Sequence, residues 1–186
     1  MTDIRDELLD IYNRRATGCY GLSAVNQRQH ALQAAALAEK QGEAAALIVA
    51  ALVHDIGHMV HDLGDDPAKE GIDDRHEELG ARWLATRFGL DVTEPVRLHV
   101  PAKRYLCSID ATYFGKLTPD SVRSFALQGG PMPPEELRDF ERQPHAEAAV
   151  RLRRIDEAAK DPHAETPPVE HFMRYVDDVL VLLRHD

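Results

Sequence analysis

The segment ALIVAALVHDIGHMVHD, residues 46–62, constrains the fold more than any other part of the chain. Its first half is entirely apolar, and such a run predicts a buried helix over about 43–58. The same helix carries His54, Asp55 and His58, although a buried ionisable group costs free energy unless something pairs with it. Imidazole and carboxylate groups together suit iron, manganese or zinc. The segment therefore indicates a metal ion held inside a helical protein.

The rest of the chain shows the helical period and no alternating strand pattern. Pro95 and Pro101 bracket a short helical piece that holds His99. The turn signals between residues 107 and 134 predict an irregular region. Helices are expected over residues 2–15, 24–42, 43–58, 73–89 and 145–160, and after the prolines at 167 and 168. We predict an all-α fold, a single helical domain that spans residues 1–186.

Composition limits the classes of function. At 186 residues the chain suits one domain with a proper core. Its formal net charge of -10 argues against nucleic acid as a partner, because phosphate backbones bind basic faces. Cys19 and Cys107 make no disulfide framework, and neither a membrane-spanning run nor a signal-peptide pattern is present. We expect a cytoplasmic protein without a membrane partner, and the oligomeric state stays open.

Further candidate metal ligands lie on other predicted helices. They are His30, His76, His99 and Asp156. A lone histidine is more often a helix cap or a structural residue than a ligand, so none of them carries weight alone. Together they supply enough side chains for a second metal ion, with Asp55 as the economical bridge between the two.

The order His30, His54–Asp55, Asp156 resembles the ligand signature of the HD-domain superfamily of helical metalloproteins. The His–Asp dipeptide alone is uninformative, because it also occurs by chance. Its second occurrence, His61–Asp62, is interpreted as a solvated helix end. The remaining histidines are interpreted as surface or structural residues: His145, His163, His171 and His185.

Within that superfamily, the chain resembles the phosphonate-cleaving di-iron oxygenases from about Tyr20 to about His171. The resemblance rests on the segments NQRQHALQAA, AALVHDIGHMV, RHEELGARWL, HVPAKRYL, LQGGPM and RRIDEAAK. HVPAKRYL and QGGPM are not general features of HD domains, so the resemblance is specific to this branch. It implies a mixed-valent Fe(II)/Fe(III) pair with dioxygen as co-substrate. The reaction it implies is cleavage of a carbon–phosphorus bond to a carboxylate and inorganic phosphate.

The resemblance also implies a role for each ligand. The first iron would bind His30, His54, Asp55 and Asp156. The second iron would share Asp55 as the bridge and would bind His76 and His99.

Substrate contacts follow from the same resemblance. His58, Lys103 and Arg153 would neutralise the phosphonate. Tyr20 would occupy an iron position until the substrate arrives and would so hold off dioxygen. Asp55, Tyr20 and His58 make up the predicted catalytic set.

Ser23 departs from one member of the family, which has a glutamate there to accept hydrogen bonds from the primary ammonium of 2-amino-1-hydroxyethylphosphonate. Serine removes that carboxylate and opens volume, and both changes favour a trimethylammonium group held by aromatic faces. Tyr20, Tyr105 and Tyr113 are the candidate aromatic partners. The expected substrate is (R)-1-hydroxy-2-(trimethylammonio)ethylphosphonate, cleaved to glycine betaine and phosphate. The primary amine, which would give glycine, is the alternative.

Two other classes of function use the same residues. A metal-dependent phosphohydrolase would need the His54–Asp55 core but neither dioxygen nor a redox-active metal. In a non-catalytic binding module the ligand set would be incidental. Six candidate ligands in family order argue against this class.

Overall fold

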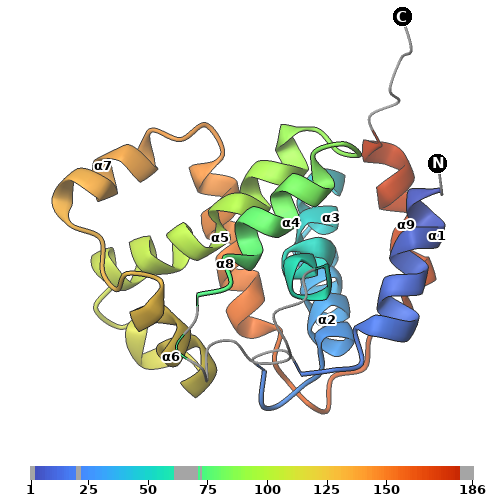
Figure 1. The fold of residues 1–186 in the computed structure, drawn as a ribbon, viewed down its shortest axis with the longest axis horizontal. Coiled ribbons are helices and arrows are strands. Elements are labelled where there is room, and N and C mark those ends of the chain that lie inside the picture. Colours follow the sequence, from blue (N-terminus) through green and yellow to red (C-terminus); the bar gives the residue numbers. More distant parts are fainter. Residues whose placement is uncertain (1–2, 20–21, 61–70, 72, 181–186) are drawn as a thin grey trace, which may run out of the picture.

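The chain folds into helices joined by turns, as Figure 1 shows. The computed structural model describes residues 3–19, 22–60, 71 and 73–180. Within these residues no strand forms, and an antiparallel bridge pairs Phe88 with Leu180. The prediction of an all-α fold is confirmed. No helix in the described part of the chain is long and apolar enough to cross a membrane.

Helix α3 (Ala45–Val53) lies at the centre of the molecule. Its residues from Leu47 to Val53 are all buried, and an apolar helix of this kind needs neighbours on several sides. The helices that contact it are α2 (Gln27–Lys40), α5 (Leu90–Ile109), α8 (Ala146–Ala158) and α9 (Val169–Val179). The apolar segment that opened the sequence analysis is therefore the core around which the other helices pack.

Helix α3 is shorter than the sequence pattern predicts. The expected helix runs to about His58, whereas α3 stops at Val53 and Asp55 has φ -98° and ψ 11°. A short 3-10 turn (Ile56–Met59) follows. Because the helix ends here, His54 and Asp55 are not held at the fixed helical angle to each other, and both side chains turn toward one centre.

Helix α4 (His76–Leu84) packs against this 3-10 turn and against α5. Helix α5 runs unbroken through Pro95 and Pro101, where the sequence pattern predicts only a short piece between them. Each proline removes one backbone hydrogen bond from the helix interior. The helix continues because its buried side chains pack against α3, α4 and α8. Tertiary packing therefore outweighs the local cost of the prolines.

The region expected to be irregular contains helix α6 (Pro119–Leu127) and leads into helix α7 (Pro134–Glu141). Each begins with proline at its first position, where the missing N–H would have no partner in the helix anyway. Thr118 caps α6 by accepting a hydrogen bond from the backbone nitrogen of Ser121 at 3.3 Å. In Figure 1, α6 and α7 lie on the opposite side of the molecule from α1 and α9.

Helix α1 (Ile4–Asp10) continues into a π-helical turn (Ile11–Arg15) and packs against α9. The buried Tyr12 donates a hydrogen bond to the carbonyl oxygen of Leu52 at 2.5 Å and so attaches this N-terminal segment to α3. A second, smaller core seats α7 against α5 and α8, and its buried residues are Leu98, Ala102, Met132, Phe140, Ala146 and Ala149. These contacts leave a cavity between the central helices and α6.

Candidate metal centre and substrate cavity

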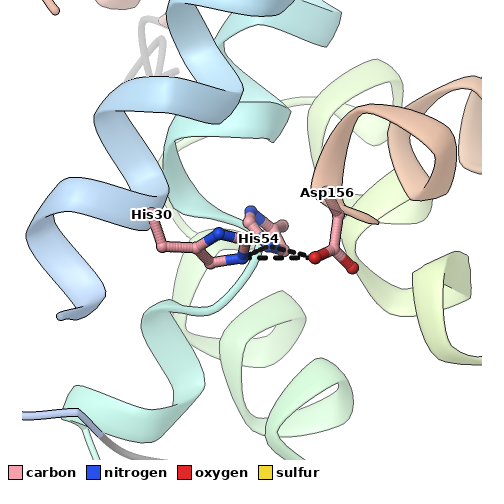
Figure 2. A group of neighbouring side chains, drawn as sticks. All are labelled: His30, His54 and Asp156. Carbon is pink, nitrogen blue, oxygen red and sulfur yellow. Dashed lines mark hydrogen bonds and ion pairs between the residues drawn. The ribbon is translucent and has the colours of Figure 1, made fainter. Parts of the chain in front are cut away.

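Three side chains converge on one point, as Figure 2 shows. His30 comes from α2, His54 follows the end of α3, and Asp156 comes from α8. Nε2 of His30 lies 3.1 Å from Nε2 of His54 and 3.2 Å from Oδ1 of Asp156. All three residues are buried. We call this set the first group.

Asp55, His76 and His99 form the second group. Nε2 of His76 lies 3.2 Å from Nε2 of His99 and 3.5 Å from Oδ1 of Asp55. Nε2 of His99 lies 3.7 Å from the same carboxylate oxygen. In each group the potential ligand atoms lie within 4.8 Å of one another.

Asp55 lies between the two groups. Its Oδ1 lies 3.5 Å from Nε2 of His76 in the second group and 3.6 Å from Nε2 of His54 in the first. Its Oδ2 lies 3.5 Å from Nε2 of His30 in the first group. Gln27 helps to orient this carboxylate by donating from Nε2 to Oδ2 at 3.4 Å. One side chain therefore reaches both groups, as a bridging ligand must.

The other nitrogen of each ring fixes which atom faces the centre. Nδ1 of His30, His54 and His99 lies 2.7–2.9 Å from a backbone carbonyl oxygen. Nδ1 of His76 lies 3.0 Å from Oδ1 of Asp74. These oxygens only accept hydrogen bonds, so Nδ1 carries the proton and Nε2 presents its lone pair. A metal-binding histidine is usually held in this way, by a hydrogen bond from the ring nitrogen that does not face the metal ion.

Metal ions fit the resulting arrangement. Two nitrogen lone pairs facing each other at 3.1 and 3.2 Å repel unless a cation lies between them. Two ligands about 2.1 Å from one metal ion, and roughly at right angles around it, are themselves about 3 Å apart. Nitrogen with carboxylate oxygen is a donor set for iron, manganese or zinc. The residues can therefore hold two metal ions, one at each group.

Both carboxylates of the centre are kept ionised. Burial alone would raise the pKa of Asp55. When the neighbouring imidazoles are protonated, their charges, that of His54 first, hold this pKa well below its usual range. Burial is likewise opposed at Asp156, where the charges of Arg153 and Lys160 lower the pKa of the carboxyl group. An ionised carboxylate is the form that binds a metal ion.

A cavity lies beside both groups and extends to α5, α6 and α8. Side chains from the two groups line it, together with three predicted substrate contacts, His58, Lys103 and Arg153. A small molecule in this cavity can therefore meet the metal positions and these three side chains at the same time.

Three cationic side chains line the cavity near Asp156, and we call them the cationic wall: Lys103, Arg153 and Lys160. Lys103 is buried, and its Nζ donates to Oγ of Ser124 at 2.9 Å. Burial, and after it the charge of Arg153, lowers the pKa of Lys103 to about 7. Nζ of Lys160 lies 3.5 Å from Oδ1 of Asp156. Such a wall suits an anion with several oxygens.

The Arg153 guanidinium has protein partners of its own. It donates to Oδ2 of Asp156 and to Oε2 of Glu157, and its Nε lies 3.2 Å from the hydroxyl of Tyr113. Arg153 therefore holds the outer oxygen of a candidate metal ligand. Its charge faces the cavity from the same position.

His58 is close to the second group but is not one of its members. Its Nδ1 lies 2.7 Å from Oδ2 of Asp74. Its ring stacks on that of His76, with centroids 4.0 Å apart and planes at 20°. His58, Asp74 and His76 also place potential ligand atoms within 4.8 Å of one another. A role of His58 distinct from metal ligation therefore stays a prediction.

Ser23 is exposed and is not among the residues that line the cavity. Its backbone nitrogen and its hydroxyl donate to Oδ2 of Asp120 at 2.9 and 2.6 Å. Asp120 does line the cavity, and its Oδ1 accepts a hydrogen bond from Arg123 at 2.8 Å. Ser23 thus affects the cavity through Asp120.

The three candidate aromatic partners of a cationic head group differ in position. Tyr20 lies outside the described residues. Tyr105 donates to Glu141, and the hydroxyl of Tyr113 accepts from Arg153. Neither of these two tyrosines lines the cavity, so the structure does not support them as head-group contacts.

The histidines interpreted as surface or structural residues lie away from the cavity lining wherever the structure describes them. His163 is exposed, and Nε2 of His171 lies 2.9 Å from Oε1 of Glu39. His145 lies 3.7 Å from the exposed Asp91. Outside the described residues fall His61–Asp62 and His185.

Sequence reasoning missed several side chains of the site: Gln27, Asp74, Asp120 and Lys160. Two of them carry a signal that could have been used. Gln27 precedes His30 by three residues in α2 and so shares a helix face with that ligand. Lys160 follows Asp156 by four residues, a helical spacing in the sequence, although it lies just beyond the end of α8. Asp74 lies before the start of α4, and Asp120 lies at the start of α6. At such positions helical spacing does not predict which way a side chain points.

Gly57 packs tightly against the backbone of His76, a residue of the second group. A Cβ atom at this position would lie 2.0 Å from the carbonyl oxygen of His76. We expect Gly57→Ala to displace the start of α4, to destabilise the fold by about 1–3 kcal/mol and to lower the metal content. Thermal unfolding and metal analysis measure both effects. Gly115→Ala, where a Cβ meets nothing within 4 Å, is the control. Normal stability and metal content in Gly57→Ala would contradict this account.

The fold and the paired His/Asp groups define a class of protein. Residues 28–139 match the model of the HD domain family. This match covers more than half of the chain, and it agrees with the helical architecture and with the order of the ligands.

Two relatives narrow the class. The chain is 41% identical over 162 residues to (1-hydroxy-2-(trimethylamino)ethyl)phosphonate dioxygenase (glycine-betaine-forming) of Leisingera caerulea, covering 87% of this chain and 83% of the relative. It is 46% identical over 158 residues to the hydroxymethylphosphonate dioxygenase of Gimesia maris, covering 84% and 79%. The chain belongs to the HD domain family and, within it, to the branch of these hydroxyphosphonate dioxygenases. The family resemblance seen in the sequence is confirmed.

Proposed function

We propose that this chain is a dioxygen-dependent di-iron oxygenase that cleaves the carbon–phosphorus bond of a 1-hydroxyphosphonate. The observation that carries the proposal is the pair of His/Asp groups that share Asp55 and line one cavity with the cationic wall. The two relatives named as phosphonate dioxygenases support the same type of reaction.

The metal ions are assigned to the two groups. The first would be held by His30, His54, Asp156 and Asp55, and the second by Asp55, His76 and His99. Bound there as a mixed-valent Fe(II)/Fe(III) pair, iron would supply the redox chemistry with dioxygen. The overall reaction balances with one dioxygen molecule. The hydroxylated carbon gains one oxygen atom and becomes a carboxylate, phosphorus gains the other and leaves as phosphate, and one proton is released.

The phosphonate is assigned to the cationic wall and His58. Arg153 and Lys160 are close to carboxylates, whereas Lys103 donates to the neutral hydroxyl of Ser124. The charge of Lys103 is therefore the least compensated of the three at short range. Among these cations, Lys103 is the principal partner of the phosphonate.

Tyr20 is proposed to occupy a metal position until the substrate enters, a role that rests on the family resemblance. Tyr20→Phe should then consume oxygen faster than the wild type when no substrate is present. An oxygen electrode measures this rate. Equal rates in the two proteins would contradict the proposed gate.

The head group of the substrate is assigned to the part of the cavity near Asp120. Both carboxylate oxygens of Asp120 already accept hydrogen bonds, one from Ser23 and one from Arg123. With the bond from the Ser23 backbone nitrogen, these bonds use three of about four acceptor positions of the carboxylate. Asp120 therefore offers negative charge but few open acceptors for the three donors of a primary ammonium. A trimethylammonium group has no N–H to satisfy, whereas unpaired donors of a primary ammonium cost about 1–3 kcal/mol. We propose (R)-1-hydroxy-2-(trimethylammonio)ethylphosphonate as the substrate, and the glycine-betaine-forming relative supports this choice.

A second candidate substrate is hydroxymethylphosphonate. The relative named for that compound is 46% identical to this chain. Hydroxymethylphosphonate has no cationic group, and histidine is the only aromatic ring among the described residues that line the cavity. The same balance of atoms would give formate and phosphate.

Ser23→Glu tests the head-group assignment. A carboxylate at this position replaces the hydroxyl that bonds Asp120, repels Asp120 and restores an acceptor. We expect kcat/KM of the wild type to be highest for the trimethylammonium compound. The variant should lose about tenfold or more of its preference over the primary amine.

The control for this substitution is Ala24→Glu, which introduces the same side chain at the next position, also exposed. It leaves the hydroxyl of Ser23 in place and should keep the wild-type preference. A wild type that works better on the primary amine or on hydroxymethylphosphonate would overturn the substrate assignment and leave the metal chemistry standing.

A metal-dependent phosphohydrolase is the rival that could use the same centre. Iron-loaded protein with substrate should show the EPR signal of an antiferromagnetically coupled mixed-valent pair. A zinc or magnesium protein that hydrolyses phosphate esters without oxygen would contradict the proposed function.

A further inference from the structure

We propose that Asp74 is a positioning residue that holds both His76 and His58 in one hydrogen-bonded array. Oδ1 of Asp74 lies 3.0 Å from Nδ1 of His76, and Oδ2 lies 2.7 Å from Nδ1 of His58. The backbone nitrogen of His76 also donates to Oδ1, at 3.3 Å. The Asp74 side chain is only 9% exposed. One carboxylate therefore contacts a ring of the second group and a ring that lines the cavity.

The array determines which nitrogen of each ring carries the proton. A carboxylate only accepts hydrogen bonds, so Nδ1 of both rings is protonated. Nε2 of His76 then presents its lone pair toward Asp55 and His99. Nε2 of His58 is the unprotonated nitrogen of that ring when the ring is neutral. Because the two rings stack at 4.0 Å, a rotation of either ring is opposed by the other.

Asparagine at position 74 would keep the shape of the side chain and break the array. Its amide has one accepting oxygen, and its NH2 group would face the N–H of one ring. That ring must then move its proton to Nε2 or turn away, and a protonated Nε2 cannot bind a metal ion. Glu77 supplies a matched control, because its Oε2 lies 3.8 Å from Nδ1 of His76, beyond hydrogen-bond distance.

Metal binding is the first test. Fe(II) binding to the full chain is measured without oxygen, by equilibrium dialysis and iron analysis. We expect Asp74→Asn to lower the affinity for one of the two ions by about 10–100-fold and to leave the affinity for the other unchanged. Glu77→Gln should spare both ions. Equal weakening of both ions in Asp74→Asn, or no weakening of either, would overturn the proposal.

Phosphate binding is the second test, because it separates the two rings. Inorganic phosphate is titrated into metal-saturated protein. His58→Ala should weaken phosphate binding and retain both metal ions. Asp74→Asn should weaken phosphate binding as well as one metal ion. Wild-type phosphate affinity in Asp74→Asn would show that Asp74 does not hold His58.

A third measurement needs no variant and so does not depend on one that folds. In zinc-loaded, nitrogen-15-labelled wild-type protein, NMR should show the proton on Nδ1 of both His58 and His76. A proton on Nε2 of the neutral ring in either residue would overturn the proposal. The inference rests on the metal centre of the proposed function, but none of its readouts requires turnover. If the protein shows these tautomers and binds two metal ions but cleaves no phosphonate, the proposed function is contradicted and the present inference is not.

Discussion

Asp55→Ala should remove both metal ions and lower turnover by about 10³-fold or more. The reason is the position of the carboxylate, whose Oδ1 lies 3.5 Å from Nε2 of His76 and whose Oδ2 lies 3.5 Å from Nε2 of His30. Its removal takes one ligand from each group at once. Metal analysis of the purified variant, dialysed alongside the wild type under the same conditions, measures the loss.

His99→Ala is the matched variant for this prediction. His99 belongs to the second group alone. The first ion therefore keeps the four ligands assigned to it, which are His30, His54, Asp156 and the bridging Asp55. We expect His99→Ala to retain the first ion and to lose the second. If Asp55→Ala and His99→Ala lose the same amount of metal, the assignment of Asp55 as the bridge is wrong.

Lys103→Met should raise KM for the phosphonate by about 10²-fold, because a hydrogen bond to a charged group contributes about 1.5–3 kcal/mol. The pKa of Lys103 is lowered to about 7 by burial and by the charge of Arg153. The ammonium is therefore present below that pH and is lost as the pH rises through it. In the wild type, kcat/KM should fall above about pH 7.

Lys103→Met is also the control for the pH dependence of kcat/KM. Lys103→Met has no ammonium to lose, so its kcat/KM should not show that alkaline fall. Lys40→Met changes an exposed lysine at the end of α2 and should behave like the wild type. An unchanged KM in Lys103→Met, or an alkaline fall of equal size in both proteins, would remove Lys103 from the phosphonate site.

The all-α class and the ligand set were both within reach of the sequence, for physical reasons. Helical period is a local property, and the apolar segment before His54 marks a central helix. Ionisable groups beside a buried segment need a partner, and a metal ion is a partner that suits histidine and aspartate together. The structure brings together all six predicted ligands in two groups and places His58, Lys103 and Arg153 in the adjoining cavity.

The departures from the predictions come from tertiary contacts. Helix α3 ends at Val53 because the following turn packs against α4 with a glycine at the contact, and that contact joins residues 57 and 76. Helix α5 continues through two prolines because α3, α4, α7 and α8 pack on it. The roles of Asp74 and Asp120 depend on which side chains face them across the fold. No local spacing encodes that information.

The central claim is that dioxygen, and not water, drives release of phosphate at this centre. The most direct measurement follows oxygen uptake and phosphate release together, with iron-loaded protein and (R)-1-hydroxy-2-(trimethylammonio)ethylphosphonate. The balance of the reaction predicts one dioxygen consumed for each phosphate released, and no phosphate when oxygen is absent. Phosphate released at the same rate without oxygen, from this compound or from a phosphate ester, would contradict the account.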